Sequence, residues 1–165
     1  LQKKNNIPKF VLVLITVGRC LFNNFLFLFS SLVLIIFLSN SFSISYFWLP
    51  LLIFISLFFS LSIGLVLGIL NVFIRDIGYL TTIVLGFTFW LTPIIYPIEI
   101  IPEYLRPIIS LNPILPIVNS YHNVMVFNLA PDFIGLSYPL VLSLILFFLA
   151  YFLFKKTSQE MTTVL

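Results

Sequence analysis

The stretch Leu91–Met125 reads LTPIIYPIEIIPEYLRPIISLNPILPIVNSYHNVM and combines a high apolar content with frequent proline. Six of the ten prolines in the chain lie between Pro93 and Pro116. Proline lacks a backbone donor and interrupts helices. In lipid, broken backbone is tolerated only where protein or a water-filled cavity surrounds it. The stretch therefore predicts neither a simple membrane crossing nor an ordinary water-exposed loop.

The composition of the whole chain predicts that it lies in a bilayer. Of its 165 residues, 61% are hydrophobic, 18% are aromatic and only 8% are charged, and the mean hydropathy is +1.21. A soluble domain carries roughly a quarter charged residues. No run of Lys and Arg interleaved with aromatic residues occurs, so no nucleic-acid partner is expected. The lone Cys20 permits no internal disulfide.

Four apolar windows are long enough to cross a membrane, which takes about 20 residues. The first window begins at Phe10 and contains Arg19, so we divide it into an interfacial or cytoplasmic helix over Ile7–Gly18 and a crossing. The chain is thus expected to be an all-α integral membrane protein, with residues 1–165 forming a single transmembrane domain. The four expected spans are residues 20–38, 48–72, 78–96 and 138–154.

The distribution of basic residues predicts the orientation of these spans. Cytoplasmic loops carry an excess of Lys and Arg. Only Arg106 falls among the segments on the opposite side, and both termini are therefore expected to be cytoplasmic. The basic residues on the expected cytoplasmic side are Lys3, Lys4, Lys9, Arg19, Arg75, Lys155 and Lys156.

Residues 99–127 are expected to form two short re-entrant helices on the outer side, before the last span. The pieces Pro102–Leu111 and Pro113–Phe127 are long enough for short helices, and proline is permitted at early helical positions. We expect Pro113 to mark the bend between them and Asn112 to accept from a freed backbone donor. The alternative is a pair of helices lying flat in the outer interface.

The turn Asn71–Gly78 carries the adjacent opposite charges Arg75 and Asp76. One interpretation is a solvated cytoplasmic turn, in which Arg75 meets lipid headgroups and Asp76 caps the next helix. The other is a mechanical role, because an exposed ion pair contributes only about 0–1 kcal/mol to stability.

Several function classes find no support in the sequence. There is no G-x-x-x-x-G-K-[ST] motif, no convergent catalytic arrangement and no second ligand for a metal at His122. We therefore predict no catalytic residues, no metal and no cofactor in this chain. Gly64 and Gly68 form a small-x-x-x-small face, which is typical of helix packing.

The run from Gly68 to Met125 resembles the C-terminal half of the ABC-2 type permeases that export bacterial polysaccharides: O-antigen, capsule and teichoic acid. The resemblance also includes the opening KKNNIPKF, which is similar to the cytoplasmic segment before the third span of that family. His122 stands where many relatives carry Arg. The residues that match the motifs of the family are Asn71, Arg75 and Asp76; Leu91, Pro93, Tyr96 and Pro97; Pro102, Glu103, Leu105, Arg106 and Pro107; Leu111, Asn112 and Pro113; and Tyr121.

The resemblance implies a permease subunit of an ATP-driven exporter in the bacterial inner membrane. Its partners would be a separate ATP-binding subunit that hydrolyses ATP, a second permease copy in a homodimer, membrane lipids, and a polysaccharide or lipid-linked glycan. The four spans correspond to the last four of six, so the chain resembles a C-terminal portion of the family. The alternative is a membrane scaffold or assembly fragment that no longer exports.

The resemblance also assigns residues to two sites. The cytoplasmic coupling contact would involve Arg75 and Asp76 with Lys3, Lys4, Pro8 and Lys9. The outer exit, where polar and aromatic side chains would meet water and polymer, would be lined by Tyr96, Tyr104, Arg106, Asn112, Pro113, Asn119, Tyr121 and His122.

Overall fold

The computed structural model divides into two compact units, Leu1–Ile44 and Ser45–Leu165. It describes residues 43–94 and 100–164 continuously, with side chains up to residue 156. In the first unit it also describes residues 18, 19, 22, 23, 25, 26, 29, 30, 33 and 37. These positions are helical, and the rings of Phe25 and Phe29 stack with centroids 6.2 Å apart. The rest of the predicted interfacial helix and first span lies outside the described residues.

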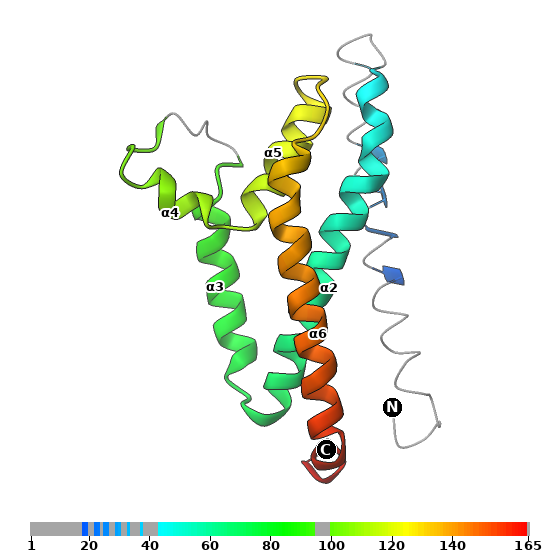
Figure 1. Cartoon of the computed structure of the whole chain (residues 1–165), viewed down its shortest axis with the longest axis vertical. Coiled ribbons are helices and arrows are strands. Elements are labelled where there is room, and N and C mark those ends of the chain that lie inside the picture. Colours follow the sequence, from blue (N-terminus) through cyan, green and yellow to red (C-terminus); the bar gives the residue numbers. More distant parts are fainter. Residues whose placement is uncertain are drawn as a thin grey trace. The chain divides into compact units, whose positions relative to one another are not determined.

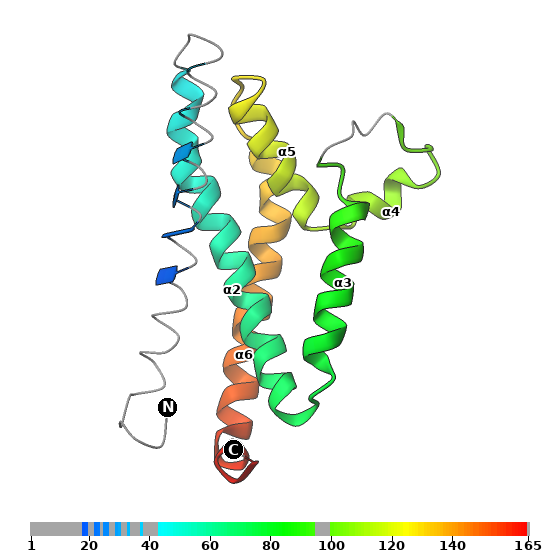
Figure 2. The same cartoon turned by 180° about the vertical axis from the view of Figure 1, so that it is seen from behind.

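The second unit is built from helices throughout its described residues (Figures 1 and 2). The long helices α2 and α6 run side by side, and the α2–α3 turn lies at the same end as the lower part of α6. The short helices α4 and α5 lie toward the other end. In chain order, the elements are η1 (Ile44–Trp48), α2 (Leu49–Phe73), α3 (Ile77–Leu91), α4 (Arg106–Ser110), α5 (Ile114–Met125) and α6 (Phe133–Val164).

Two of these helices are long and apolar enough to cross a membrane: Ile44–Phe73, which joins η1 to α2, and Phe133–Lys156 within α6. The 25 residues of α2 alone span about 37 Å, against a hydrocarbon core of about 30 Å. Val66 and Ile69 of α2 pack against Ala150 of α6. Near the other end of the pair, the rings of Trp48 and Phe133 meet edge to face at 5.1 Å. These two candidate spans overlap the spans predicted at residues 48–72 and 138–154.

Helix α6 begins at Phe133, five residues before the expected start of the fourth span at about Tyr138. The reason is a cap that a hydropathy window does not detect. The Gly135 amide donates to Oδ1 of Asp132 at 3.1 Å, and the Leu136 amide donates to the Asp132 carbonyl at 2.9 Å. Pro139 lies inside the helix, where it removes only one backbone donor.

Helix α3 ends at Leu91, before the expected end of the third span at about Tyr96. Thr92 is extended (φ −86°, ψ 124°), because Pro93 disfavours the helical conformation in the residue before it. At 15 residues the helix is about 22 Å long, which is shorter than the hydrocarbon core.

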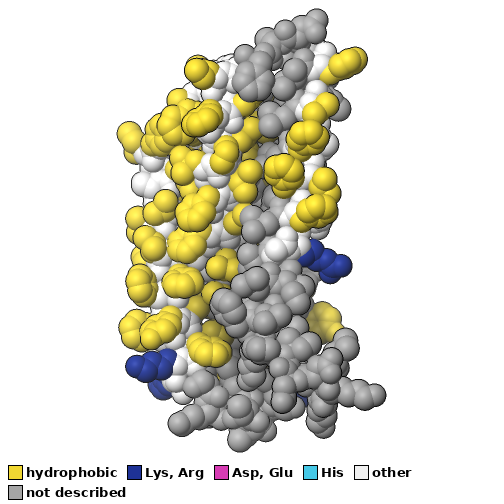
Figure 3. Space-filling model, turned by 90° about the vertical axis from the view of Figure 1, so that its right-hand side faces the viewer, with side chains coloured by type: hydrophobic (Ala, Val, Ile, Leu, Met, Phe, Trp, Pro, Cys, Tyr) yellow, Lys and Arg dark blue, Asp and Glu magenta, His cyan; other side chains and the backbone are white. Residues whose placement is uncertain are grey.

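Hydroxyl groups in the long helices are satisfied within their own helix. Most of these side chains donate to the carbonyl four residues earlier, which pairs the hydroxyl without water. Large apolar side chains dominate the described surface in the space-filling view (Figure 3), as expected for a protein surrounded by lipid. The hydroxyls bonded in this way belong to Ser56, Ser60, Ser62, Thr81, Thr82, Thr88, Thr92 and Ser143.

We predict that Asp132→Ala destabilises the start of α6 by about 1 kcal/mol, because it removes the side-chain acceptor of the Gly135 amide. Hydrogen exchange of residues 133–137 in detergent should be faster, and the melting temperature should fall. Asp132→Asn keeps an acceptor oxygen and serves as the control. Equal exchange in both variants would show that the side chain does not cap the helix.

Candidate functional site

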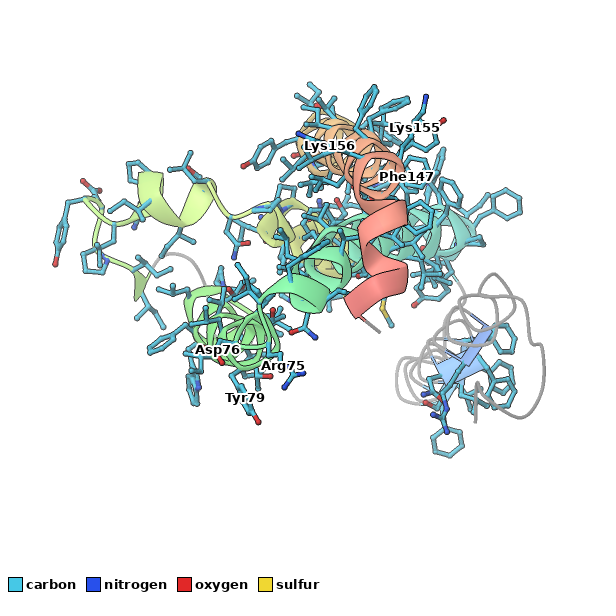
Figure 4. All side chains as sticks on the ribbon, turned by 90° about the horizontal axis from the view of Figure 1, so that it is seen from below. Arg75, Asp76, Tyr79, Phe147, Lys155 and Lys156 are labelled. Atoms are coloured by element: carbon cyan, nitrogen blue, oxygen red, sulfur yellow. The ribbon has the colours of Figure 1, made fainter. Side chains whose placement is uncertain are left out.

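The α2–α3 turn, residues 74–76, places two exposed charges at one end of the second unit. Ile74 is extended (φ −126°, ψ 99°) and its carbonyl accepts from the Ile77 amide at 3.2 Å. The side chains of Arg75 and Asp76 are exposed. Seen from below, they lie at the start of α3, at the same end of the unit as Lys155 and Lys156 of α6 (Figure 4).

The cap of α3 comes from Asn71 in the last turn of α2. The Gly78 amide donates to Oδ1 of Asn71 at 2.9 Å, whereas Asp76 makes no side-chain cap hydrogen bond. The prediction that Asp76 caps this helix was therefore wrong. A Cβ at Gly78 would lie 3.3 Å from the same oxygen, so the close approach favours glycine here. The amide of Asn71 fixes the turn, and neither charge is used in the cap.

We predict that Asn71→Ala loosens the turn, because the Gly78 amide loses its acceptor, at a cost of about 1 kcal/mol. Amide exchange over residues 77–80 should be several-fold faster in detergent. Asp76→Ala is the matched comparison and should change this exchange less. Faster exchange in Asp76→Ala than in Asn71→Ala would show that Asp76 caps the helix, as the sequence suggested.

Residues 100–127, here called the outer segment, have a small core of their own. Ile101, Ile109 and Leu115 are buried together, one each from the loop, α4 and α5. Nε of Arg106 donates to the Ile101 carbonyl at 3.1 Å, so the guanidinium holds the loop that precedes α4. Tyr104 is 76% exposed. The two short helices were expected, although α4 begins at Arg106 rather than at Pro102.

Asn112 sits at the junction between α4 and α5 and makes two hydrogen bonds. Its Oδ1 accepts from the Ile114 amide at 3.0 Å, which confirms the predicted role beside the bend at Pro113. Its Nδ2 donates to Oγ1 of Thr92 at 2.8 Å, a contact that the sequence did not indicate. The adjoining Leu111 carbonyl accepts from the Tyr138 hydroxyl at 2.8 Å.

Helix α5 packs on α2 and α6, and its buried residues Ile117, Ser120 and Val124 share one face, whereas the buried Leu115 belongs to the core with Ile101 and Ile109. Asn119 is exposed and His122 is half-buried. Tyr121 was expected to meet water and polymer, but it is half-buried with its hydroxyl 3.4 Å from Oγ of Ser56 on α2. That hydroxyl therefore faces the helix pair rather than the open side.

The predicted site residues fall into two groups, one at each end of the unit. Arg75 and Asp76 form the first group, and the described outer residues form the second. The second group extends over two helices, because α4 lies beside the upper end of α3 whereas α5 lies beside α2 and α6 (Figures 1 and 2). The predicted residues that lie outside the described part of the chain are Lys3, Lys4, Pro8, Lys9 and Tyr96.

Sequence reasoning did not indicate the hydrogen bonds that Thr92, Tyr138 and Asp132 make. A signal existed for Asp132, because aspartate directly before an apolar run is a common helix start. No signal existed for Thr92 or Tyr138, whose hydrogen-bond partners lie 20 and 27 positions away.

Two apolar grooves flank the helices of the second unit. One, of about 400 Å³, lies between α2 and α6 and includes Gly64 and Gly68. A Cβ at either glycine would meet no other atom within 4 Å, so this predicted packing face is not packed against another described helix. The other, of about 310 Å³, is lined by α2, α3 and the start of α5.

The fold and the two sites define an all-helical integral membrane protein with an exposed charged turn at one end and a proline-broken segment at the other. Residues 6–126 match the family of ABC-2 type transporters, and the chain belongs to that family. It is therefore the permease component of an ABC transporter and is not itself the catalytic subunit. Permeases of this type work with ATP-binding subunits, usually as dimers. A comparison with curated proteins finds no match.

Proposed function

We propose that the chain is a permease subunit that exports a polysaccharide or a lipid-linked glycan across the bacterial inner membrane. The observation that carries this proposal is the outer segment, in which four prolines and two short helices replace a continuous crossing. Broken backbone of this kind belongs beside protein or a hydrated pathway. The resemblance to the exporters of O-antigen, capsule and teichoic acid supplies the class of cargo.

The proposed topology has four crossings with both termini in the cytoplasm. The first crossing is residues 20–38, and α3 is the third, with flanking residues at each end adding to its 22 Å or so. Support comes from the basic residue Arg75 in the α2–α3 turn and from Lys155 and Lys156 in the lower part of α6, because these two parts lie at the same end of the second unit. The outer segment then faces the periplasmic side.

The exposed side chains of the outer segment are suited to weak contacts with a polymer that moves past them. Tyr104 and Asn119 are exposed and offer a ring face and an amide. Ring contacts contribute on the order of 1 kcal/mol each. Several weak contacts allow movement where one tight site would hold the cargo, as in conducting pores. Two copies of the chain would enclose a hydrated conduit, because a hydroxyl-rich polymer cannot cross lipid directly.

The α2–α3 turn is the proposed contact for the ATP-binding subunit. Arg75 and Asp76 are exposed, and neither is needed for the cap that Asn71 supplies. In this proposal Lys3, Lys4, Pro8 and Lys9 extend the same contact from the N-terminal part of the chain. The two charges then serve recognition rather than folding.

Cysteine labelling tests the topology. In a Cys20→Ser background, Ser137→Cys should react with a membrane-impermeant maleimide added to intact cells, because Ser137 is exposed near the outer end of α6. Arg75→Cys should react only after the membrane is opened. Labelling of Ser137→Cys solely from the cytoplasmic side would reverse the orientation.

A cysteine scan of α5 tests whether its open face borders water. Reactivity should be highest at Asn119 and lowest at the buried positions Ile117, Ser120 and Val124, and it should therefore follow the helical period. Uniform reactivity would indicate an ordinary solvated loop. Uniform protection would indicate a plug without a hydrated side.

Deletion of the gene in the source cell tests export itself. Surface glycan should disappear and lipid-linked glycan should accumulate inside, as measured by sugar analysis of both fractions. At equal protein level, Arg75→Ala should lower export about tenfold, the effect of losing one charge-assisted contact of about 1.5 kcal/mol. Lys156→Ala, an exposed basic residue at the same end, is the control. Unchanged surface glycan after deletion would favour the non-transporting scaffold instead.

A further inference from the structure

Helix α3 is attached to the rest of the second unit at its two ends. At the start, the Gly78 amide bonds to Asn71 of α2, and just after the end, Thr92 bonds to Asn112. Between these points none of its 15 residues is buried. Thr81 and Thr88 donate only to carbonyls of α3 itself in their hydroxyl hydrogen bonds.

A groove accompanies this middle part of α3. It has a volume of about 310 Å³ and is lined by Phe59, Ile63 and Leu67 of α2, by one face of α3, and by Asn112 and its neighbours. By contrast, α2 and α6 pack closely around Val66, Ile69 and Ala150. The pair α2–α6, which shares these buried contacts beside a groove of its own, is here called the frame. The middle of α3 contributes no buried residue to a contact with it.

The junction Leu111–Pro113 is where the frame and α3 meet the outer segment. Tyr138 of α6 holds the Leu111 carbonyl, while Thr92 at the end of α3 holds the next residue, Asn112. Oδ1 of the same asparagine accepts from the amide of Ile114, the first residue of α5. One side chain thus connects α3 to α5, directly beside a point fixed to the frame.

The Thr92 hydroxyl acts both as a hydrogen-bond donor and as an acceptor. It donates to the Thr88 carbonyl at 2.7 Å and accepts from Asn112 at 2.8 Å, and the residue is only 1% exposed. If the bond to Asn112 were broken, water could not readily replace it, because Thr92 is buried. The bond between Thr92 and Asn112 is therefore a stable link rather than an exposed contact.

We propose that Asn112 is a positioning residue that transmits movement of α3 to the outer helix α5. A push on the α2–α3 turn displaces α3 along the groove, because a helix moves as a stiff unit. Because Asn112 is bonded to Thr92, it moves together with the end of α3. Helix α5 then rotates about Leu111, whose carbonyl is bonded to Tyr138 of α6. This inference rests on the proposed function, in which the turn receives the ATP-driven movement and α5 borders the exit.

Hydrogen exchange of the full chain in lipid nanodiscs tests the link without any transport. Thr92→Val removes the acceptor while keeping the shape of the side chain, so exchange of the amides in residues 111–118 should be about fivefold faster, as for a net hydrogen bond of about 1 kcal/mol. Thr92→Ser keeps the hydroxyl and should exchange like the wild type. Thr88→Val, one turn earlier, loses only a bond within α3 and is the matched control. Equal exchange in Thr92→Val and Thr88→Val would overturn the proposal.

Export measured per ATP hydrolysed in the assembled transporter tests the transmission. Thr92→Val should lower this ratio several-fold while ATP hydrolysis continues, and Thr92→Ser should restore it. A purely structural role would lower hydrolysis and export together, and that result, or an unchanged ratio, would overturn the proposal. If gene deletion leaves surface glycan unchanged, the proposed export fails, while the exchange experiment still decides whether α3 and α5 are linked.

Discussion

Every backbone donor and acceptor of this chain that lies in lipid must find its partner inside the protein. This constraint explains why the described chain consists of helices and why serine and threonine hydroxyls bond to carbonyls of their own helix. It also explains the outer segment, where prolines remove donors and free carbonyls. There the asparagine side chain at position 112 supplies a bond that a continuous helix would have supplied through its backbone.

Two hydrogen bonds between different elements are made by asparagine side chains. Asn71 caps α3 from the preceding helix, and Asn112 joins two elements at the outer junction. An amide bonds to backbone without burying a net charge, so its desolvation costs much less than that of an ion. The charges at Arg75 and Asp76 stay exposed, which suits them to recognition at a membrane surface.

The arrangement separates a packed frame from a less constrained helix. Helices α2 and α6 share a buried apolar core, and aromatic contacts such as that of Trp48 with Phe133 hold their outer ends together. Helix α3 lacks buried residues and is bonded mainly at its ends. A permease component that changes conformation with its ATP-binding partner needs such a difference in packing, because closely packed interiors resist gradual deformation.

The sequence by itself determined that the protein lies in a membrane and is helical. It also indicated the two long apolar helices and the two short helices in a proline-broken segment. It further indicated that Asn112 would accept from a freed backbone donor, and the structure identifies that donor as the amide of Ile114, two residues on. Hydropathy did not give the end of α3 or the start of α6, since an apolar window measures compatibility with lipid and is insensitive to Pro93 and to the cap at Asp132. Helix ends depend on single residues that satisfy or remove individual hydrogen bonds.

Only the tertiary structure decided which distant groups meet. Thr92 reaches Asn112 across 20 positions, Tyr138 reaches Leu111 across 27, and Tyr121 turns toward Ser56 across 65. Each of these side chains has several possible partners in a sequence so rich in hydroxyls and amides. The packing of α2, α3, α5 and α6 brings one partner within reach, and the low polarity around the helices makes that one bond costly to leave unmade.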